Sequence, residues 1–153
     1  MTSLLFVCTG NTCRSPLAEV LARLEAERRN MDVTIASAGT FALEGSPASA
    51  HSIRAAERRG ADLSAHRSRP LCPDALEGAD LILAMTPGHL TAVRTEHGRE
   101  LNASLVTDYL PEGHDRRGEA VADPIGGGED EYEQVARLLE QCVESILDRL
   151  AEQ

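Results

Sequence analysis

Residues 4–21 read LLFVCTGNTCRSPLAEVL, in which an apolar run, a polar turn and a helical pattern follow one another directly. The apolar run at residues 4–7 is typical of a buried parallel strand. Gly10 and Asn11 then supply turn chemistry, because these residue types adopt left-handed backbone conformations most readily. Pro16 is tolerated in the first turn of a helix, and apolar residues recur at helical spacing after it. The stretch therefore predicts a strand, a tight loop and a helix.

The same alternation continues along the rest of the chain. Three further apolar runs predict strands, at residues 33–35 (ending by 37–39), 79–85 and 101–106. Helical spacing and helix-start residues predict helices at residues 15–29, 49–59, 87–97 and from about residue 130 onward. Residues 107–128 are polar and rich in glycine and proline, which predicts a long loop of a kind that is uncommon unless functional. This order predicts an α/β protein with a parallel sheet, and residues 1–153 are expected to form a single domain.

Composition narrows the classes of function. The 153-residue chain has 42% hydrophobic and 26% charged residues, which is typical of a globular domain. Its net charge of −10 argues against general nucleic-acid binding, because nothing would neutralise phosphates over a broad face. No apolar run approaches the roughly 20 residues that span a bilayer, and the N-terminus has no basic leader. We therefore expect a cytoplasmic protein with no membrane partner.

The cysteines and histidines give no sign of a metal site. The four cysteines are spaced unlike any zinc pattern, and the five histidines are scattered along the chain. In a reducing compartment the cysteines should be mostly free thiols, so their reactivity matters more than their pairing. The sequence predicts neither a metal nor a cofactor.

Residues 8–15, here called the Cys8 loop, have the form C-x5-R-S at the predicted strand-to-helix junction. Backbone N–H groups of such a loop can turn inward around a tetrahedral dianion, and the following helix adds its dipole at the same point. Arg14 can return its planar guanidinium to two phosphate oxygens. This positive field favours a thiolate at Cys8, to which the Ser15 hydroxyl group can donate. The candidate phosphate-binding residues are Thr9, Gly10, Asn11, Thr12, Cys13, Arg14 and Ser15.

C-x5-R alone is a weak pattern that also arises by chance. The alternative is a buried cysteine and a surface arginine that lie near a helix start for structural reasons. The whole octapeptide, however, sits at the junction where ligands bind in open α/β sheets, which favours a phosphate site.

The stretch VCTGNTCRSPLAE, residues 7–19, resembles the signature loop of low-molecular-weight protein tyrosine phosphatases, and more closely that of their bacterial protein-arginine-phosphatase branch. The resemblance continues in Ser37-Ala38-Gly39, in ADLILAMT at residues 79–86 and in DPIGG at residues 123–127. It implies a flavodoxin-like, three-layer α/β/α fold with a four-stranded parallel sheet. His66 lies in a further similar segment, where we expect a structural hydrogen bond.

The resemblance also implies the chemistry. Cys8 would attack phosphorus to form a phosphocysteine, Arg14 would stabilise the phosphoryl oxygens, and Asp123 would act as general acid. By itself, Asp123-Pro124 is equally well interpreted as a plain turn. Cys13 either packs under the loop or, as the resemblance implies, is a redox partner that forms a reversible disulfide with Cys8. The implied partners are phosphorylated protein substrates, and the oligomeric state stays open.

Two residues favour phosphoarginine over phosphotyrosine as the substrate. Thr12 stands where tyrosine-directed relatives carry a bulky aliphatic residue, and Ile125 stands where they carry an aromatic residue after the Asp-Pro pair. Two other classes remain: an arsenate reductase, which would need further cysteines for a thiol relay, and a non-catalytic phosphate-binding module. Cys72 has no second cysteine a few residues away, which argues against an arsenate reductase. Cys8, Arg14 and Asp123 are all present, which argues against a non-catalytic module, so a phosphatase is the preferred interpretation.

Overall fold

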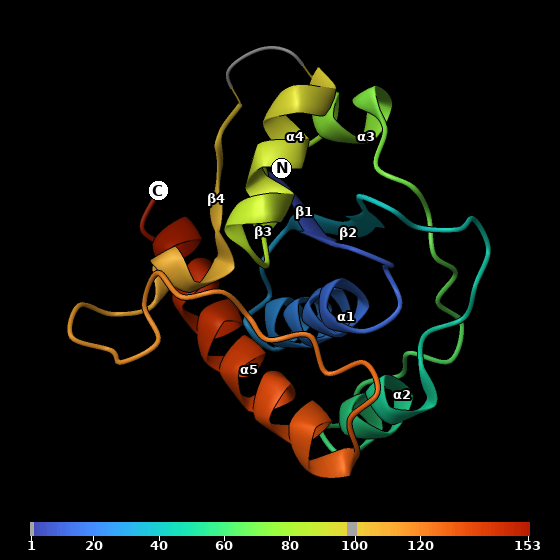
Figure 1. Ribbon diagram of the computed structural model, residues 1–153. Coiled ribbons are helices and arrows are strands. Elements are labelled where there is room, and N and C mark those ends of the chain that lie inside the picture. The colour runs from blue at the N-terminus through green and yellow to red at the C-terminus, as the bar shows by residue number, and fades with distance from the viewer. Residues whose placement is uncertain (1, 98–100) are drawn as a thin grey trace.

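Four parallel strands form one sheet in the order β2-β1-β3-β4 (Figure 1). The computed structural model describes residues 2–97 and 101–153. The strands are β1 (Thr2–Cys8), β2 (Val33–Gly39), β3 (Leu81–Ala84) and β4 (Ala103–Leu105). In the parallel register, Val7 pairs with Ala38 of β2 and Ala84 of β3. The predicted α/β class, the parallel sheet and its four strands are confirmed.

Helices cover both faces of the sheet. They are α1 (Arg14–Arg28), α2 (Ala50–Glu57), α3 (Pro73–Glu77), α4 (Pro87–His97), the 3-10 helix η1 (Val106–Tyr109) and α5 (Glu129–Ala151). Figure 1 shows α3 and α4 on one side of the sheet and α1 and α5 on the other, which gives three layers. Among the described residues, no helix combines the length and the apolar character needed to cross a membrane.

Alternate residues of β1 face two separate cores, as the period of a strand requires. Leu4 and Phe6 pack among the side chains of α1 and α5, whereas Leu5 and Val7 pack with residues of α3 and α4. All four side chains are at most 2% exposed. Burial on both faces explains why this strand is a continuous apolar run in the sequence instead of an alternating one.

The observed elements differ from the predicted ones at several boundaries. The third strand begins only at Leu81, because Asp80 uses its side chain to accept the Ser3 N–H at 2.8 Å. The fourth strand ends at Leu105, whose N–H donates to the Asp108 carboxylate at 3.0 Å as the chain turns into η1. Helix α3 was not predicted, since five residues with one buried side chain leave no periodic pattern.

The topology brings three chain segments to one edge of the sheet. Strands β1 and β3 are neighbours, and the loops that leave their carboxyl ends lead to helices in different layers. Such a switch point is where ligands bind in open α/β sheets. The irregular segment between η1 and α5 returns to this edge, where the Val121 N–H donates to the Met85 carbonyl oxygen at 2.8 Å.

Candidate active site

The backbone of the Cys8 loop is held by hydrogen bonds from outside it. The carbonyl oxygens of Cys8, Thr9 and Thr12 each accept a backbone N–H at 2.9 Å, donated by Thr40, Phe41 and Ser49, respectively. The N–H groups of residues 10–15, in contrast, find no acceptor within the described part of the chain. Carbonyl oxygens that face outward and unpartnered N–H groups next to a helix start are the parts of an anion-binding nest.

Two residue types allow this loop to close tightly. Asn11 has φ of +56°, in the left-handed region that asparagine tolerates better than most residues. Gly39, at the end of β2, lies directly against the loop, where an added Cβ would meet the Thr9 carbonyl oxygen at 2.4 Å and the Asn11 nitrogen at 3.0 Å. The Ser37-Ala38-Gly39 segment therefore ends in glycine because the Cys8 loop occupies the space of a side chain.

A buried hydrogen-bond chain leads from the Cys8 sulfur into the interior. The Cys8 Sγ lies 2.9 Å from the Ser15 Oγ, and the Asn11 side-chain amide donates to the oxygens of Ser15 and Ser37 at 2.8 and 2.9 Å. Ser37 in turn donates to the carboxylate of Glu19. Because the Ser15 oxygen already accepts from Asn11, its own proton is free to donate to the sulfur. The chain therefore orients the Ser15 hydroxyl group toward the Cys8 sulfur.

Two residues from the segment before α3 fix Asn11 from the other side. The ring Nε2 of His66 lies 2.7 Å from the Asn11 carbonyl oxygen, and the Arg69 N–H donates to the Asn11 side-chain oxygen at 3.0 Å. The structural hydrogen bond predicted for His66 is therefore present. Asn11 itself is fully buried, so each of these partners replaces water that the amide would otherwise bind.

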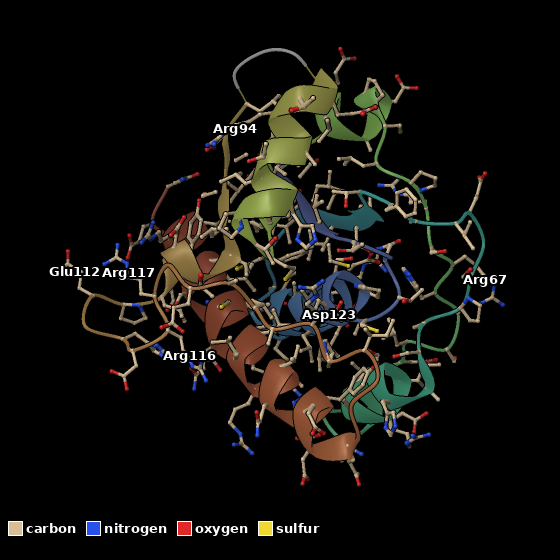
Figure 2. All side chains as sticks on the ribbon, in the orientation of Figure 1. Arg67, Arg94, Glu112, Arg116, Arg117 and Asp123 are labelled. Atoms are coloured by element: carbon tan, nitrogen blue, oxygen red, sulfur yellow. The ribbon has the colours of Figure 1, made fainter. Side chains whose placement is uncertain are left out.

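Arg14 and Asp123 meet above the loop, although they are far apart in the sequence. An Arg14 Nη2 lies 3.6 Å from an Asp123 carboxylate oxygen, and the Nη1 donates to the Val121 carbonyl oxygen at 2.9 Å. The Arg14 side chain is 5% exposed, whereas that of Asp123 is 46% exposed. Asp123 lies near the centre of Figure 2, in front of α1, while Arg67, Glu112 and Arg117 lie at the periphery. The structure thus brings the candidate acid to the mouth of the loop.

Cys13 points away from this site and toward α5. Its sulfur lies 3.3 Å from the Tyr132 hydroxyl oxygen and 3.6 Å from the Ser49 hydroxyl oxygen. Burial, and after it the hydrogen bond to Cys13, raises the pKa of Tyr132. Cys8 and Cys13 are both free and buried. The reversible disulfide between them stays a prediction.

The two candidate specificity residues differ in their surroundings. Thr12 is half-buried, with its hydroxyl oxygen 3.8 Å from the Cys13 sulfur, whereas Ile125 is 69% exposed. The Ile125 N–H donates to the Asp123 carboxylate at 3.0 Å, which fixes the backbone beside the candidate acid. Two more apolar side chains, Phe41 and Leu43, are 88% and 79% exposed on the segment that binds the Cys8 loop. The described residues contain no cluster of three or more metal-ligating side chains.

His89 is a residue of this site that the sequence analysis missed. It lies in the first turn of α4, is 7% exposed, and places its Nε2 2.8 Å from the Thr9 hydroxyl oxygen. Burial, and next to it the positive charge of Arg14, lowers the pKa of His89 from 6.5 to about 4. Thr86, immediately before α4, is a residue type typical of helix starts, and it marks the turn in which His89 lies.

These groups suit one kind of chemistry. The Cys8 sulfur contacts a serine hydroxyl group at the start of a loop with unpartnered N–H groups, and the buried guanidinium of Arg14, from the same loop, contacts the more exposed carboxyl group of Asp123. A thiol, a guanidinium and a carboxyl group in this arrangement can serve as nucleophile, oxyanion stabiliser and proton donor in the transfer of a phosphoryl group. With the flavodoxin-like fold, they fit the class of phosphatases.

Comparison with known proteins gives the family. The family model for low molecular weight phosphotyrosine protein phosphatase matches residues 3–153, so the chain belongs to this family. It is 38% identical to a protein-arginine-phosphatase from Bacillus subtilis, over 96% of this chain and 95% of that protein. It is 35% identical to the low molecular weight protein-tyrosine-phosphatase PtpB from Staphylococcus epidermidis, over 94% and 95%.

A solved structure agrees closely with this one. It is described as YwlE arginine phosphatase, a cysteine-to-serine mutant with a phosphorylated active-site serine. The two chains superpose with a TM-score of 0.91 at 35% identity, over 99% of this chain and 97% of the other. The predicted family and the flavodoxin-like fold are therefore confirmed, and the chain is a phosphatase of a family that acts on phosphoarginine or phosphotyrosine proteins.

Proposed function

We propose that this chain is a protein-arginine phosphatase that transfers the phosphoryl group of a phosphoarginine side chain to Cys8 and then to water. The observation that carries the chemistry is the position of the Cys8 sulfur, 2.9 Å from a serine hydroxyl group and at the start of a loop whose N–H groups are unpartnered among the described residues. The phosphorylated active-site serine in the YwlE mutant supports a phosphoryl acceptor of this kind.

The reaction proceeds in two displacements. In the first, the Cys8 thiolate attacks phosphorus, the bond from phosphorus to the guanidine nitrogen breaks, and Asp123 donates its proton to that nitrogen. In the second, water attacks the phosphocysteine, the P–S bond breaks, and the Asp123 carboxylate takes a proton from the water. The N–H groups of the Cys8 loop and Arg14 stabilise the phosphoryl oxygens in both transition states.

The contact between Arg14 and Asp123 places the proposed acid next to the phosphoryl group. The Arg14 Nη2 lies 3.6 Å from an Asp123 carboxylate oxygen, so the guanidinium that binds the phosphoryl oxygens also lies beside the acid. In the proposed mechanism, Asp123 gives up its proton in the first step and takes one from water in the second.

The preference for phosphoarginine rests on the rim of the site. Thr12 offers a hydroxyl group at the half-buried edge of the loop, and Ile125 followed by two glycines leaves no aromatic ring after Asp123. A planar cationic guanidinium suits a polar wall near a carboxylate better than an apolar slot. The exposed ring of Phe41 is compatible with either substrate, because both guanidinium and phenyl groups stack on aromatic faces. The 38% identity to an arginine phosphatase supports the same choice.

Phosphotyrosine is the second candidate substrate. The tyrosine-directed relative from Staphylococcus epidermidis is 35% identical over nearly the whole chain, so overall similarity discriminates poorly between the two. The distinction therefore depends on Thr12 and on the segment after Asp123.

Parallel kcat/KM measurements on a phosphoarginine and a phosphotyrosine peptide test the proposal. We expect the wild type to prefer phosphoarginine, and Thr12→Ile to lower that activity by about 10- to 100-fold while raising phosphotyrosine turnover, because a polar partner is lost and an apolar edge is gained. Thr95→Ile, at an exposed position of α4, is the matched control and should change neither activity. A wild type that prefers phosphotyrosine would identify a tyrosine phosphatase.

The covalent step has its own test. Cys8→Ser should abolish turnover of both peptides while inorganic phosphate or vanadate still binds, because the nest and Arg14 remain in place. Turnover near the wild-type rate would show that another residue accepts the phosphoryl group.

A further inference from the structure

His89 makes side-chain contacts to two separate segments. Its Nε2 lies 2.8 Å from the Thr9 hydroxyl oxygen, and its Nδ1 lies 3.1 Å from the Thr86 hydroxyl oxygen. The same Thr86 oxygen also accepts the backbone N–H of His89 at 3.2 Å and so caps α4. The imidazole therefore bridges the helix start after β3 and the first residue of the Cys8 loop after the nucleophile.

The pattern of donors and acceptors fixes the direction of these hydrogen bonds. The Thr86 oxygen already accepts one N–H, so its hydroxyl proton is available for the Nδ1 of the neutral ring. The ring proton then resides on Nε2 and is donated to Thr9. A ring proton on Nδ1 would leave the hydroxyl proton of half-buried Thr86 without an acceptor. A ring proton on Nε2 instead leaves the hydroxyl proton of Thr9 without a protein acceptor, and Thr9 is exposed to water.

Thr9 is consequently held on two sides. Its carbonyl oxygen accepts the Phe41 N–H at 2.9 Å, and its side chain accepts from His89. The peptide that leads from Cys8 into the nest is clamped between these two contacts. Gly10, which follows, has no side chain that could restrain the loop in their place.

We propose that His89 is a positioning residue of the phosphate cradle: through Thr9, it holds the first peptide of the Cys8 loop in the orientation that binds the phosphoryl group. This inference rests on the proposed function of the loop, but not on the identity of the phosphorylated side chain. A hydrogen bond lost at this point lowers the affinity for a bound oxyanion and the rate of phosphoryl transfer together.

The two nitrogen positions of His89 can be tested separately. Glutamine can place an amide N–H near the Nε2 position, whereas asparagine reaches only as far as Nδ1. We measure inhibition by inorganic orthovanadate and kcat/KM on p-nitrophenyl phosphate. His89→Asn should weaken vanadate inhibition and lower kcat/KM by about three- to tenfold, and His89→Gln should stay within about twofold of the wild type.

Thr9→Val provides the second arm of the experiment. Thr9→Val should lower kcat/KM and weaken vanadate inhibition by the same factors as His89→Asn. The double variant His89→Asn/Thr9→Val should lose no more than either single variant, because all three remove the same hydrogen bond. His114→Asn is the matched control on a remote loop, where the ring contacts Gln141. Thermal unfolding of each variant shows whether a loss of kcat/KM or of vanadate inhibition comes from lower stability alone.

The outcomes separate this inference from the function on which it rests. Three results would contradict the role of His89 without contradicting phosphate binding by the Cys8 loop. They are equal losses of kcat/KM in the Gln and Asn variants, wild-type kcat/KM in both, and additive losses in the double variant. A wild type that vanadate does not inhibit would overturn the cradle and, with it, this inference.

Discussion

Substitution of Gly39 by alanine probes the Cys8 loop without replacing any of its residues. The new Cβ would lie 2.4 Å from the Thr9 carbonyl oxygen, 3.0 Å from the Asn11 nitrogen and 2.8 Å from the Ala42 Cβ. Ordinary contacts begin at 3.4 Å, so Thr9 and Gly39 must separate by about 1 Å. Gly39 does not have positive φ, so the whole cost comes from this contact.

We expect Thr9 to move more readily than Gly39, although Thr9 has hydrogen bonds to Phe41 and His89. The Gly39 N–H donates to the Arg69 carbonyl oxygen at 3.0 Å, and its own carbonyl oxygen accepts the Leu71 N–H at 2.8 Å. These bonds, together with the parallel pairing to Cys8, hold Gly39 in the sheet, whereas Thr9 is exposed. Overpacking of this kind costs about 1–3 kcal/mol of stability, and a displacement of 1 Å in a catalytic group costs about 100-fold in rate.

Steady-state kinetics on an aryl phosphate and thermal unfolding together measure both effects. We expect kcat/KM of Gly39→Ala to fall by about 100-fold while the unfolding free energy falls by no more than about 3 kcal/mol. Gly78→Ala is the control, because its Cβ would find its nearest neighbour at 3.6 Å. Full activity in a destabilised Gly39→Ala would show that the strand moves instead of the loop, which would refute the reasoning.

Three further predictions concern the proton donor, the second cysteine and His89. Asp123→Asn should slow turnover most for substrates with poor leaving groups and least for an activated aryl phosphate, and equal losses on both would make Asp123 structural. Mild peroxide should inactivate the enzyme reversibly through a Cys8–Cys13 disulfide; mass spectrometry that finds Cys8 sulfinic acid with free Cys13 would contradict this. Because burial and Arg14 lower the pKa of His89 from 6.5 to about 4, protons bind preferentially to the unfolded chain in this interval. The unfolding free energy should therefore decrease by up to about 3 kcal/mol as the pH falls from 6.5 to 4, and denaturant titrations of His89→Gln should lack this component.

The strand, loop and helix at the N-terminus could be predicted because their signals are local. A buried run, two turn residues and a proline followed by helical spacing lie within residues 4–21, and the structure places β1, the Cys8 loop and α1 there. The short elements were predicted less well. Helix α3 has only five residues and one buried side chain, and β4 ends where the Leu105 N–H donates to the Asp108 carboxylate, so periodicity reveals neither.

The meeting of Arg14 and Asp123 depends on contacts that no local pattern encodes. By itself Asp123-Pro124 suggested only a turn, and the resemblance to a family pointed to its role. The structure supplies a physical reason for the proximity: Val121 donates to Met85 after β3 and accepts from Arg14. These two hydrogen bonds draw the irregular segment over the loop. His89 was missed for the same reason, since its partner Thr9 lies 80 residues away in the sequence.

The contacts around Asn11 explain how folding orders the Cys8 loop, the proposed phosphate cradle. Its backbone adopts a left-handed conformation, and its buried amide contacts Ser15, Ser37 and the Arg69 N–H while its carbonyl oxygen contacts His66. These partners come from α1, β2 and the segment before α3, so the packing of three elements holds the loop. A preorganised site loses little conformational entropy on binding and needs little reorganisation in the transition state. The same dependence on distant partners means that substitutions at Ser37 or His66, neither of which touches the substrate in the proposed mechanism, should weaken the binding of vanadate.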